Sequence, residues 1–282
     1  MKKILFFETP VFTGATRVTR TIAKTLQSRY EVAFAIVDPN NDNLQGEIEE
    51  KIRENNPQIL FSSFVSINPG VVEVGKELGL YVVIRQDFNL RDLTERTIQR
   101  VIETYPRADF IITQTLEMKL EFHSIKELRD CRIKVIDNPL DKEDILEKAA
   151  APNPFEDNGY FHFLWVGRKD PIKGLPVLEK AFGAVNNQFS NTDLTLITND
   201  SNPYRWIRHA DCVVISSFSE ASPNVLKEAM FLGAPVVSTD CSPVIRRALP
   251  EQRIAKVGDS NDLAEKMISV IKEDYGSHKK IN

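Results

Sequence analysis

Two glutamates, Glu220 and Glu228, lie eight residues apart in the stretch SFSEASPNVLKEAMFLGAPVVSTD (217–240). The first precedes a predicted helix and the second lies two turns inside it. A carboxylate at the margin of a buried helix face can accept hydrogen bonds from a pair of ligand hydroxyls. Taken alone, Glu228 is better explained as an exposed helix residue and Glu220 as loop polarity. Whether the two glutamates bind a ligand must therefore be judged from the neighbouring residues.

The predicted helix at 224–232 starts after a Ser-Pro pair. Ser222 can cap this helix and Pro223 suits its first position. The backbone N–H groups around Asn224 and Val225 then form a helix N-terminus, which attracts anions. A helical wheel places four apolar side chains in the buried stripe and Glu228 at its margin. These four are Val225, Leu226, Ala229 and Met230.

A loop with two cations, GRKDPIKG (167–174), follows the apolar run FLWV. Gly167 ends the strand, and Arg168 and Lys173 flank a Pro turn. An Arg offers a planar fork to a diphosphate, and a Lys offers a point charge. A solvated turn is the alternative explanation. Loops that follow core strands often carry function, so the sequence supports a diphosphate-binding loop and a solvated turn about equally.

The first half of the chain has weaker candidates at the ends of its strands. Arg85, Gln86 and Asp87 follow an apolar strand and could contact a sugar or an acceptor, or could simply be loop polarity. Asn138 and Asp141 lie at the domain junction, where a structural turn is the simpler explanation.

No standard nucleotide or metal motif is present. Gly14 is the one glycine between the first strand and the first helix, so the G-x-G-x-x-G fingerprint is absent, although one glycine still allows a phosphate to approach the backbone. There is no Walker loop and no G-x-S-x-G elbow. The sequence therefore predicts no metal site and no cofactor. The histidines, which also lack metal spacing, are His123, His162, His209 and His278.

The elements that must position these residues alternate between short apolar strands and amphipathic helices, which is typical of parallel sheets covered on both faces. Strands are expected at 3–8, 31–37, 58–64, 81–87, 109–115 and 133–138, and then at 161–167, 194–198, 212–217, 234–240 and 253–257. The helices identified are 16–29, 95–105, 175–185, 224–232 and 261–274.

This order predicts an α/β protein of two Rossmann-like domains that face each other across a cleft. The Ala/Pro/Asn/Gly passage at about 146–160 is the expected linker, with an N-terminal domain at 1–145 and a C-terminal domain at 146–282. Ligands of open parallel sheets bind beyond the carboxyl ends of the strands, where the candidate residues lie.

Composition excludes several classes of protein. The 282 residues carry a net charge of −4 and no strongly basic half, which argues against nucleic acid as the main partner. The three cysteines are widely spaced and lack a C-x-x-C pair, as in reduced cytosolic proteins. The first residues have too short an apolar run for a signal peptide, and no stretch reaches the roughly 18 apolar residues of a membrane span.

A cytoplasmic protein is therefore expected. Arg17, Arg20 and Lys24 share one helix face. Peripheral contact with anionic lipid at the inner membrane face stays open, although such cations more often serve solubility.

Four stretches together resemble the retaining glycosyltransferases of the GT-B fold, specifically glycosyltransferase family 4. Residues 163–182 are similar to the family's strand, Gly-Arg and Lys-Gly loop. Residues 219–240 match its E-x7-E signature and the Gly-x-Pro-Val-Val strand that follows. Residues 133–141 resemble its Asn-Gly/Pro-x-Asp turn, and residues 12–32 are a thin version of its Gly-rich opening.

The resemblance implies a metal-independent hexosyl or N-acetylhexosaminyl transferase that uses a nucleotide-sugar, expected to be a UDP-sugar, in polysaccharide or glycolipid biosynthesis. The acceptor would be a glycan or glycolipid. Arg168 and Lys173 would hold the donor diphosphate, Glu220 would contact the donor sugar, and Glu228 would bind the ribose. The remaining donor contacts implied are Gly14, Gly167, Ser222, Pro223, Asn224 and Val225, and the acceptor or sugar side would hold Arg85, Gln86, Asp87 and Asn138.

The chain departs from the family pattern at several positions. Ala221 replaces the usual glycine after the first glutamate, Gln86 stands where a histidine is common, and Thr16 replaces a frequent glutamate. The connection between 194–198 and 212–217 is short on the nucleobase side. A non-catalytic GT-B module that serves as a binding or partner subunit is therefore an alternative, and a sugar-nucleotide epimerase is a weaker one.

Overall fold

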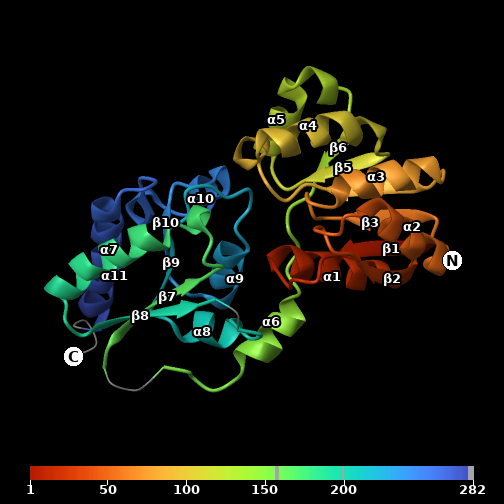
Figure 1. Cartoon of the computed structure of the whole chain (residues 1–282). Helices are drawn as coiled ribbons and strands as arrows, with labels where there is room; N and C mark the ends of the chain where they lie inside the picture. Colours follow the sequence, from red (N-terminus) through yellow and green to blue (C-terminus); the bar gives the residue numbers. More distant parts are fainter. Residues whose placement is uncertain (156–158, 199, 279–282) are drawn as a thin grey trace. The chain divides into compact units, whose positions relative to one another are not determined.

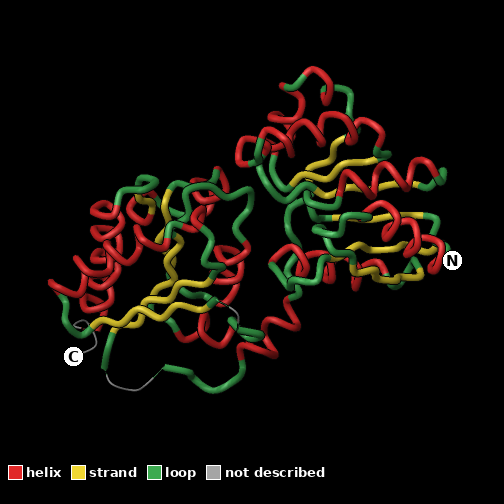
Figure 2. The backbone as a smooth tube through the Cα atoms, viewed as in Figure 1, coloured by secondary structure: helices red, strands yellow, loops and turns green. Residues whose placement is uncertain are grey.

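The computed structural model describes residues 1–155, 159–198 and 200–278, with side chains described up to Glu273. The chain divides into two compact units, Met1–Pro139 and Leu140–Asn282. Each unit is a parallel β-sheet with helices on both faces (Figures 1 and 2). The predicted α/β class of two Rossmann-like domains is therefore confirmed.

Unit 1 is built on a six-stranded parallel sheet of order β2-β1-β3-β4-β5-β6. Its strands are β1 (Lys3–Glu8), β2 (Glu31–Ile36), β3 (Ile59–Ser62), β4 (Tyr81–Arg85), β5 (Phe110–Thr113) and β6 (Ile133–Val135). Its helices are α1 (Gly14–Leu26), α2 (Leu44–Asn55), α3 (Asn68–Glu77), α4 (Glu95–Thr104) and α5 (Leu116–Ser124).

Unit 2 is built on a five-stranded parallel sheet of order β11-β10-β9-β7-β8. Its strands are β7 (Phe161–Val166), β8 (Thr192–Ile197), β9 (Cys212–Ile215), β10 (Val236–Thr239) and β11 (Ile254–Ala255). Its helices are α6 (Lys142–Ala149), α7 (Leu175–Gln188), α8 (Tyr204–His209), α9 (Asn224–Leu232), α10 (Pro243–Ala248) and α11 (Ser260–His278).

Buried side chains on both faces of each sheet form the cores. In unit 2, α7 and α11 pack Leu178 and Met267 against one face of the sheet. Helices α8, α9 and α10 cover the other face, where Leu226 and Ile245 are wholly buried. Because both faces are covered, central strands such as β1 and β7 are largely buried apolar runs, whereas the edge strand β8 alternates polar and apolar residues.

The boundary between the units lies between Pro139 and Leu140, six residues before the predicted one. Residues predicted as the start of the linker belong to α6, which packs against α8. Its side chains Ile145 and Ala149 are buried in the core of unit 2. The passage from 150 to 155 and at 159–160 has no regular secondary structure, and residues 156–158 of the predicted linker lie outside the described residues.

Within the described residues, none of the helices is long and apolar enough to span a membrane.

The cysteine side chains lead to a chemical prediction. Burial raises the pKa of Cys212 and of Cys241 to about 12, so both stay protonated thiols near neutral pH. Only Cys131 is partly exposed, and burial raises its pKa as well. At pH 8 the native protein is expected to react with a thiol reagent such as DTNB at Cys131 only, and slowly, because the thiolate is the reactive form. The unfolded protein should titrate all three thiols. Rapid modification of two or three thiols in the native protein would contradict this burial.

Candidate functional site

Two loops meet at the carboxyl edge of the unit 2 sheet. The first, Gly167–Gly174, follows β7, and the second, Ser216–Pro223, follows β9, the strand paired with β7. Phe218 N donates to Ile172 O at 2.7 Å, and Ser216 Oγ donates to Lys173 O at 2.8 Å. These bonds fix the cationic loop against the loop that carries Glu220.

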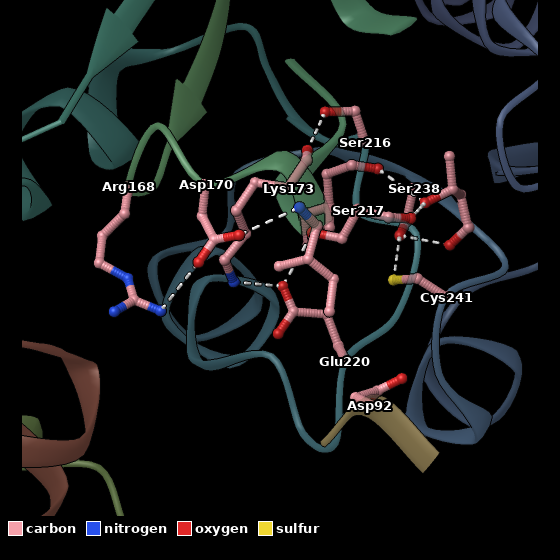
Figure 3. A network of polar contacts seen from close by, with 12 residues as sticks. Asp92, Arg168, Asp170, Lys173, Ser216, Ser217, Glu220, Ser238 and Cys241 are labelled. Atoms are coloured by element: carbon pink, nitrogen blue, oxygen red, sulfur yellow. Dashed lines mark hydrogen bonds and ion pairs between the residues drawn. The ribbon is translucent and has the colours of Figure 1, made fainter. Parts of the chain in front are cut away.

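An ion pair between Lys173 and Glu220 lies where the two loops meet (Figure 3). Lys173 Nζ is 2.5 Å from Glu220 Oε1, and Ser217 Oγ donates to the same oxygen at 2.8 Å. The two charged side chains are 24% and 17% exposed, so they remain within reach of a ligand. The structure thus brings together two residues that the sequence predicted as catalytic, although they are 47 positions apart.

Arg168 lies on the same loop with its side chain half exposed. Its nearest acidic group is Asp170, with Nη2 and Oδ2 3.7 Å apart. The other carboxylate oxygen of Asp170, Oδ1, accepts a hydrogen bond from Ile172 N at 3.1 Å and so caps the short helical turn Pro171–Lys173. An exposed pair at this distance is worth little, so Arg168 can leave it for an anion at small cost.

Gly174 allows the two loops to touch. Its φ is +63°, and a Cβ built there would lie 2.1 Å from Ser216 O. Only glycine combines this left-handed conformation with such a close backbone approach. Gly167 instead packs on the Trp165 ring, where an added Cβ would lie 3.0 Å from the nearest ring atom.

Helix α9 begins at Asn224, as predicted, but its start is built differently. Pro223 is the N-cap residue and Asn224 the first helical residue, so Pro223 lies one position before the first helical position that the sequence predicted for it. Pro223 itself has extended backbone angles, which allow the chain to enter the helix one residue later. The N–H groups of the first turn nevertheless lie at the carboxyl edge of the sheet, directly after the Glu220 loop.

The buried face of α9 also differs from the helical-wheel prediction. Glu228 is only 2% exposed, whereas Met230, predicted to be buried, is 49% exposed. Leu226 and Ala229 are buried as expected. The interpretation of Glu228 as a solvated helix residue is therefore wrong. A buried carboxylate is stable only when it is hydrogen-bonded or paired, so its position on this helix is specific.

Ala221 does not strain the Glu220 loop. Among the described non-glycine residues only Asn56 has a positive φ, so the backbone at 221 needs no glycine. Ala221 is buried, and its carbonyl accepts from Ser242 Oγ at 3.1 Å. The departure from the family pattern is accommodated by this packing.

Residues at the end of β10 and just after it form hydrogen bonds with the backbone of the Glu220 loop. Glu220 N donates to Cys241 O at 2.9 Å, and Thr239 Oγ1 donates to Ser217 O at 2.6 Å. Sequence reasoning did not identify Ser216, Ser217 or Thr239. All three follow or end a predicted strand, so the rule that sites lie at carboxyl ends of strands was the signal that could have found them.

In unit 1, the structure brings Arg85 and Asn138 together through a hydrogen bond from Arg85 Nη2 to Asn138 Oδ1. Arg85 is almost wholly buried, and burial lowers the pKa of its guanidinium against the opposing effect of Asp87 and Asp137. An arginine nevertheless stays charged. Arg85, Asp87 and Asn138 thus form one cluster at the carboxyl ends of β4 and β6.

Gln86 has its side chain inside unit 1. It is 0% exposed, donates from Nε2 to Phe88 O at 2.9 Å, and accepts from Tyr105 at 2.8 Å. Asn68 Nδ2 in turn donates to the Tyr105 hydroxyl at 2.9 Å. These contacts favour a structural role, and they supply a reason for glutamine at this position.

Gly14 is the exposed first residue of α1. Thr13 caps this helix, and Thr16 completes a reciprocal capping box with it. The threonine in place of a glutamate therefore has a local structural function. Asp141 likewise caps α6, accepting from Asp144 N at 3.2 Å, in agreement with the structural turn predicted there.

Two comparisons with known protein sequences each match part of the chain. Residues 162–273 match the family model described as glycosyl transferases group 1. An uncharacterized glycosyltransferase of Methanocaldococcus jannaschii is 29% identical over 185 residues, which are 54% of this chain and 45% of that protein. The chain thus spans about half the length of this curated relative.

Solved structures resemble the whole chain in fold. HepE of Anabaena, solved with UDP and glucose, aligns with a TM-score of 0.76 at 15% identity, over 98% of this chain and 91% of that chain. Sucrose-phosphate synthase of Thermosynechococcus elongatus aligns with a TM-score of 0.74 at 13% identity, over 96% and 90% of the two chains. The GT-B fold is confirmed, and the family match confirms the resemblance of unit 2 to group 1 glycosyltransferases.

Proposed function

We propose that this chain, whose residues 162–273 match the glycosyl transferases group 1 family, transfers a sugar from a nucleotide-sugar to a glycan or glycolipid acceptor. The observation that carries the proposal is the Lys173–Glu220 pair, with Arg168 on the same loop, at the carboxyl edge of a Rossmann-like sheet. The donor proposed is a UDP-sugar, and the solved HepE structure contains UDP.

Two cations on one loop suit a leaving diphosphate. Bond cleavage at the donor sugar places negative charge on the departing nucleotide, and fixed positive charges that meet this charge lower the barrier. Arg168 offers a planar fork to two phosphate oxygens, and Lys173 offers an ammonium group. With these two side chains neutralising the diphosphate, the proposed reaction needs no metal ion.

The two glutamates would hold the two ends of the donor. Glu220 lies beside Lys173, so its second carboxylate oxygen can meet the sugar attached to the diphosphate. Glu228, inside α9, would accept from the ribose hydroxyls, with the backbone N–H groups of Asn224 and Val225 at the phosphate. We also propose retention of configuration, with the acceptor attacking the face from which the diphosphate leaves.

The acceptor is proposed to bind unit 1. The Arg85, Asp87 and Asn138 cluster offers donors and acceptors that suit sugar hydroxyls. Gly14, at the exposed start of α1, would approach a phosphate through its backbone. Gln86 would act indirectly, by fixing the loop after β4.

A nucleotide panel tests the proposal. Thermal unfolding is measured with UDP, GDP, ADP and CMP, and UDP is expected to raise the Tm by several degrees, since a ligand at 100 times its Kd stabilises the native state by about 2.7 kcal/mol. Arg168→Ala should abolish most of this rise because it removes a phosphate contact. Lys169→Ala is the matched control: it removes an exposed cation from the same loop and should keep the rise.

The outcomes separate the candidate functions. Donor turnover with an acceptor mixture, followed by mass detection of a glycosylated product, supports the transferase. No shift with any nucleotide would favour the non-catalytic module. Isomerised donor formed without an acceptor would instead reveal an epimerase.

A further inference from the structure

Ser217 occupies a position that the proposed function does not yet use. It is the second residue after β9 and is 2% exposed. Its hydroxyl donates to Glu220 Oε1 at 2.8 Å. Its own carbonyl accepts from Thr239 Oγ1 at 2.6 Å, which ties the serine to the end of the neighbouring strand β10. A buried hydroxyl with its backbone fixed in this way has little freedom to turn elsewhere.

Lys173 and Ser217 share one oxygen of Glu220. Both donate to Oε1, at 2.5 Å and 2.8 Å (Figure 3). In the proposed reaction the Lys173 ammonium also serves the donor diphosphate, whose charge exceeds that of a carboxylate and draws the ammonium towards it. Any weakening of the Lys173–Glu220 contact leaves the serine hydroxyl as the donor that keeps this carboxylate in place.

The adjacent serine has a different partner. Ser216 Oγ donates to the backbone carbonyl of Lys173 at 2.8 Å. Ser216 therefore fixes the loop that carries the cation, whereas Ser217 fixes the carboxylate. Two neighbouring side chains of the same type thus contact the two halves of one ion pair.

We propose that Ser217 is a positioning residue for Glu220, and that it holds the carboxylate beside the donor sugar while Lys173 binds the diphosphate. This inference rests on the proposed function. It assigns Ser217 to the chemical step and Ser216 to the binding of the nucleotide. The two serines should therefore give different kinetic defects.

The test compares Ser217→Ala with Ser216→Ala. Ser217→Ala is expected to lower kcat of sugar transfer about 10-fold or more, the effect of losing one hydrogen bond to a charged group, while the Kd for UDP by calorimetry changes less than twofold. Ser216→Ala is expected to weaken UDP binding several-fold, with the smaller effect on kcat. Equal changes in Kd for both variants, with kcat unchanged in Ser217→Ala, would overturn the assignment.

A double-mutant cycle excludes a general structural effect. If Ser217 acts through the Glu220 carboxylate, Ser217→Ala should cost much less in the Glu220→Ala background, which removes the acceptor, than in the wild-type background. Equal losses in both backgrounds would show that Ser217 acts elsewhere and would overturn the inference. A wild-type chain that neither binds UDP nor transfers sugar would overturn the proposed function itself, and the role of Ser217 with it. An active wild type with an unaffected Ser217→Ala variant would overturn the role of Ser217 alone.

Discussion

Replacing Lys173 by alanine is expected to lower kcat of sugar transfer by about 10²–10³-fold, the range seen when one preorganised group that stabilises transition-state charge is removed. The ammonium is the group closest to Glu220, 2.5 Å from Oε1, and it lies on a loop held by Ser216 and Phe218. Arg168, at the other end of the same loop beside Asp170, is proposed to bind the diphosphate and does not replace the ammonium next to Glu220. Donor turnover at saturating donor and acceptor measures the loss.

The same substitution also has a cost in stability, which must be separated from the loss of rate. Lys173→Ala leaves the Glu220 side chain, 17% exposed, without its cation, and an uncompensated carboxylate destabilises the fold. The double variant Lys173→Ala/Glu220→Gln should recover much of the lost Tm without recovering kcat. Retention of kcat within threefold in Lys173→Ala, with Lys169→Ala as the control, would show that Lys173 does not serve the leaving group.

The fold could be predicted from the sequence because its signals are local. Most of the eleven strands are short apolar runs bounded by turn residues, and the alternating edge strand β8 could still be found from Leu194, Leu196 and Ile197. Helix α9 was predicted at its observed bounds, Asn224–Leu232, because a Ser-Pro start and a Gly233 end enclose it. Helix α6 was missed because its eight residues bury only Ile145 and Ala149, too few for a periodic pattern.

The side of α9 that faces the protein could not be predicted from hydrophobicity. Leu226 and Glu228 are both buried, yet they point about 200° apart on a helix of 3.6 residues per turn. The helix is therefore covered on two sides, and a helical wheel assumes only one. The wheel placed Met230 inside and Glu228 at the margin because it scores side-chain type, while tertiary contacts decide which side chains are buried.

The sequence predicted which strand ends carry the residues of the candidate site, but it did not predict which of these residues contact one another. The rule for open parallel sheets selected Arg168, Lys173 and Glu220 from two loops after neighbouring strands. That Lys173 and Glu220 form an ion pair depends on the pairing of β7 with β9 and on the hydrogen bonds between the loops, which are non-local. Ser217 was missed for the same reason: a serine after a strand has no distinctive spacing.

A second large effect is expected from Gly174→Ala, which should lower the free energy of unfolding by about 2 to 4 kcal/mol. Two costs combine. The φ of +63° is unfavourable for alanine, and the new Cβ would lie 2.1 Å from Ser216 O, so the two loops must move apart. Because the Lys173–Glu220 contact spans these loops, kcat/KM should also fall by about 10²-fold, in line with a displacement of about 1 Å at a reacting centre.

Gly233→Ala in the same unit is the matched control for this prediction. Gly233 has a φ of +78° and no atom within 4 Å of an added Cβ, so its substitution measures the backbone cost alone, about 1 to 2 kcal/mol. Urea unfolding of both variants gives the difference, which is the cost of separating the loops at Ser216. If Gly174→Ala were no less stable than Gly233→Ala and kept its kcat/KM, the close approach of the two loops would not be required. The activity would then have to arise from residues that tolerate a wider separation, and the Lys173–Glu220 pair could not be its centre.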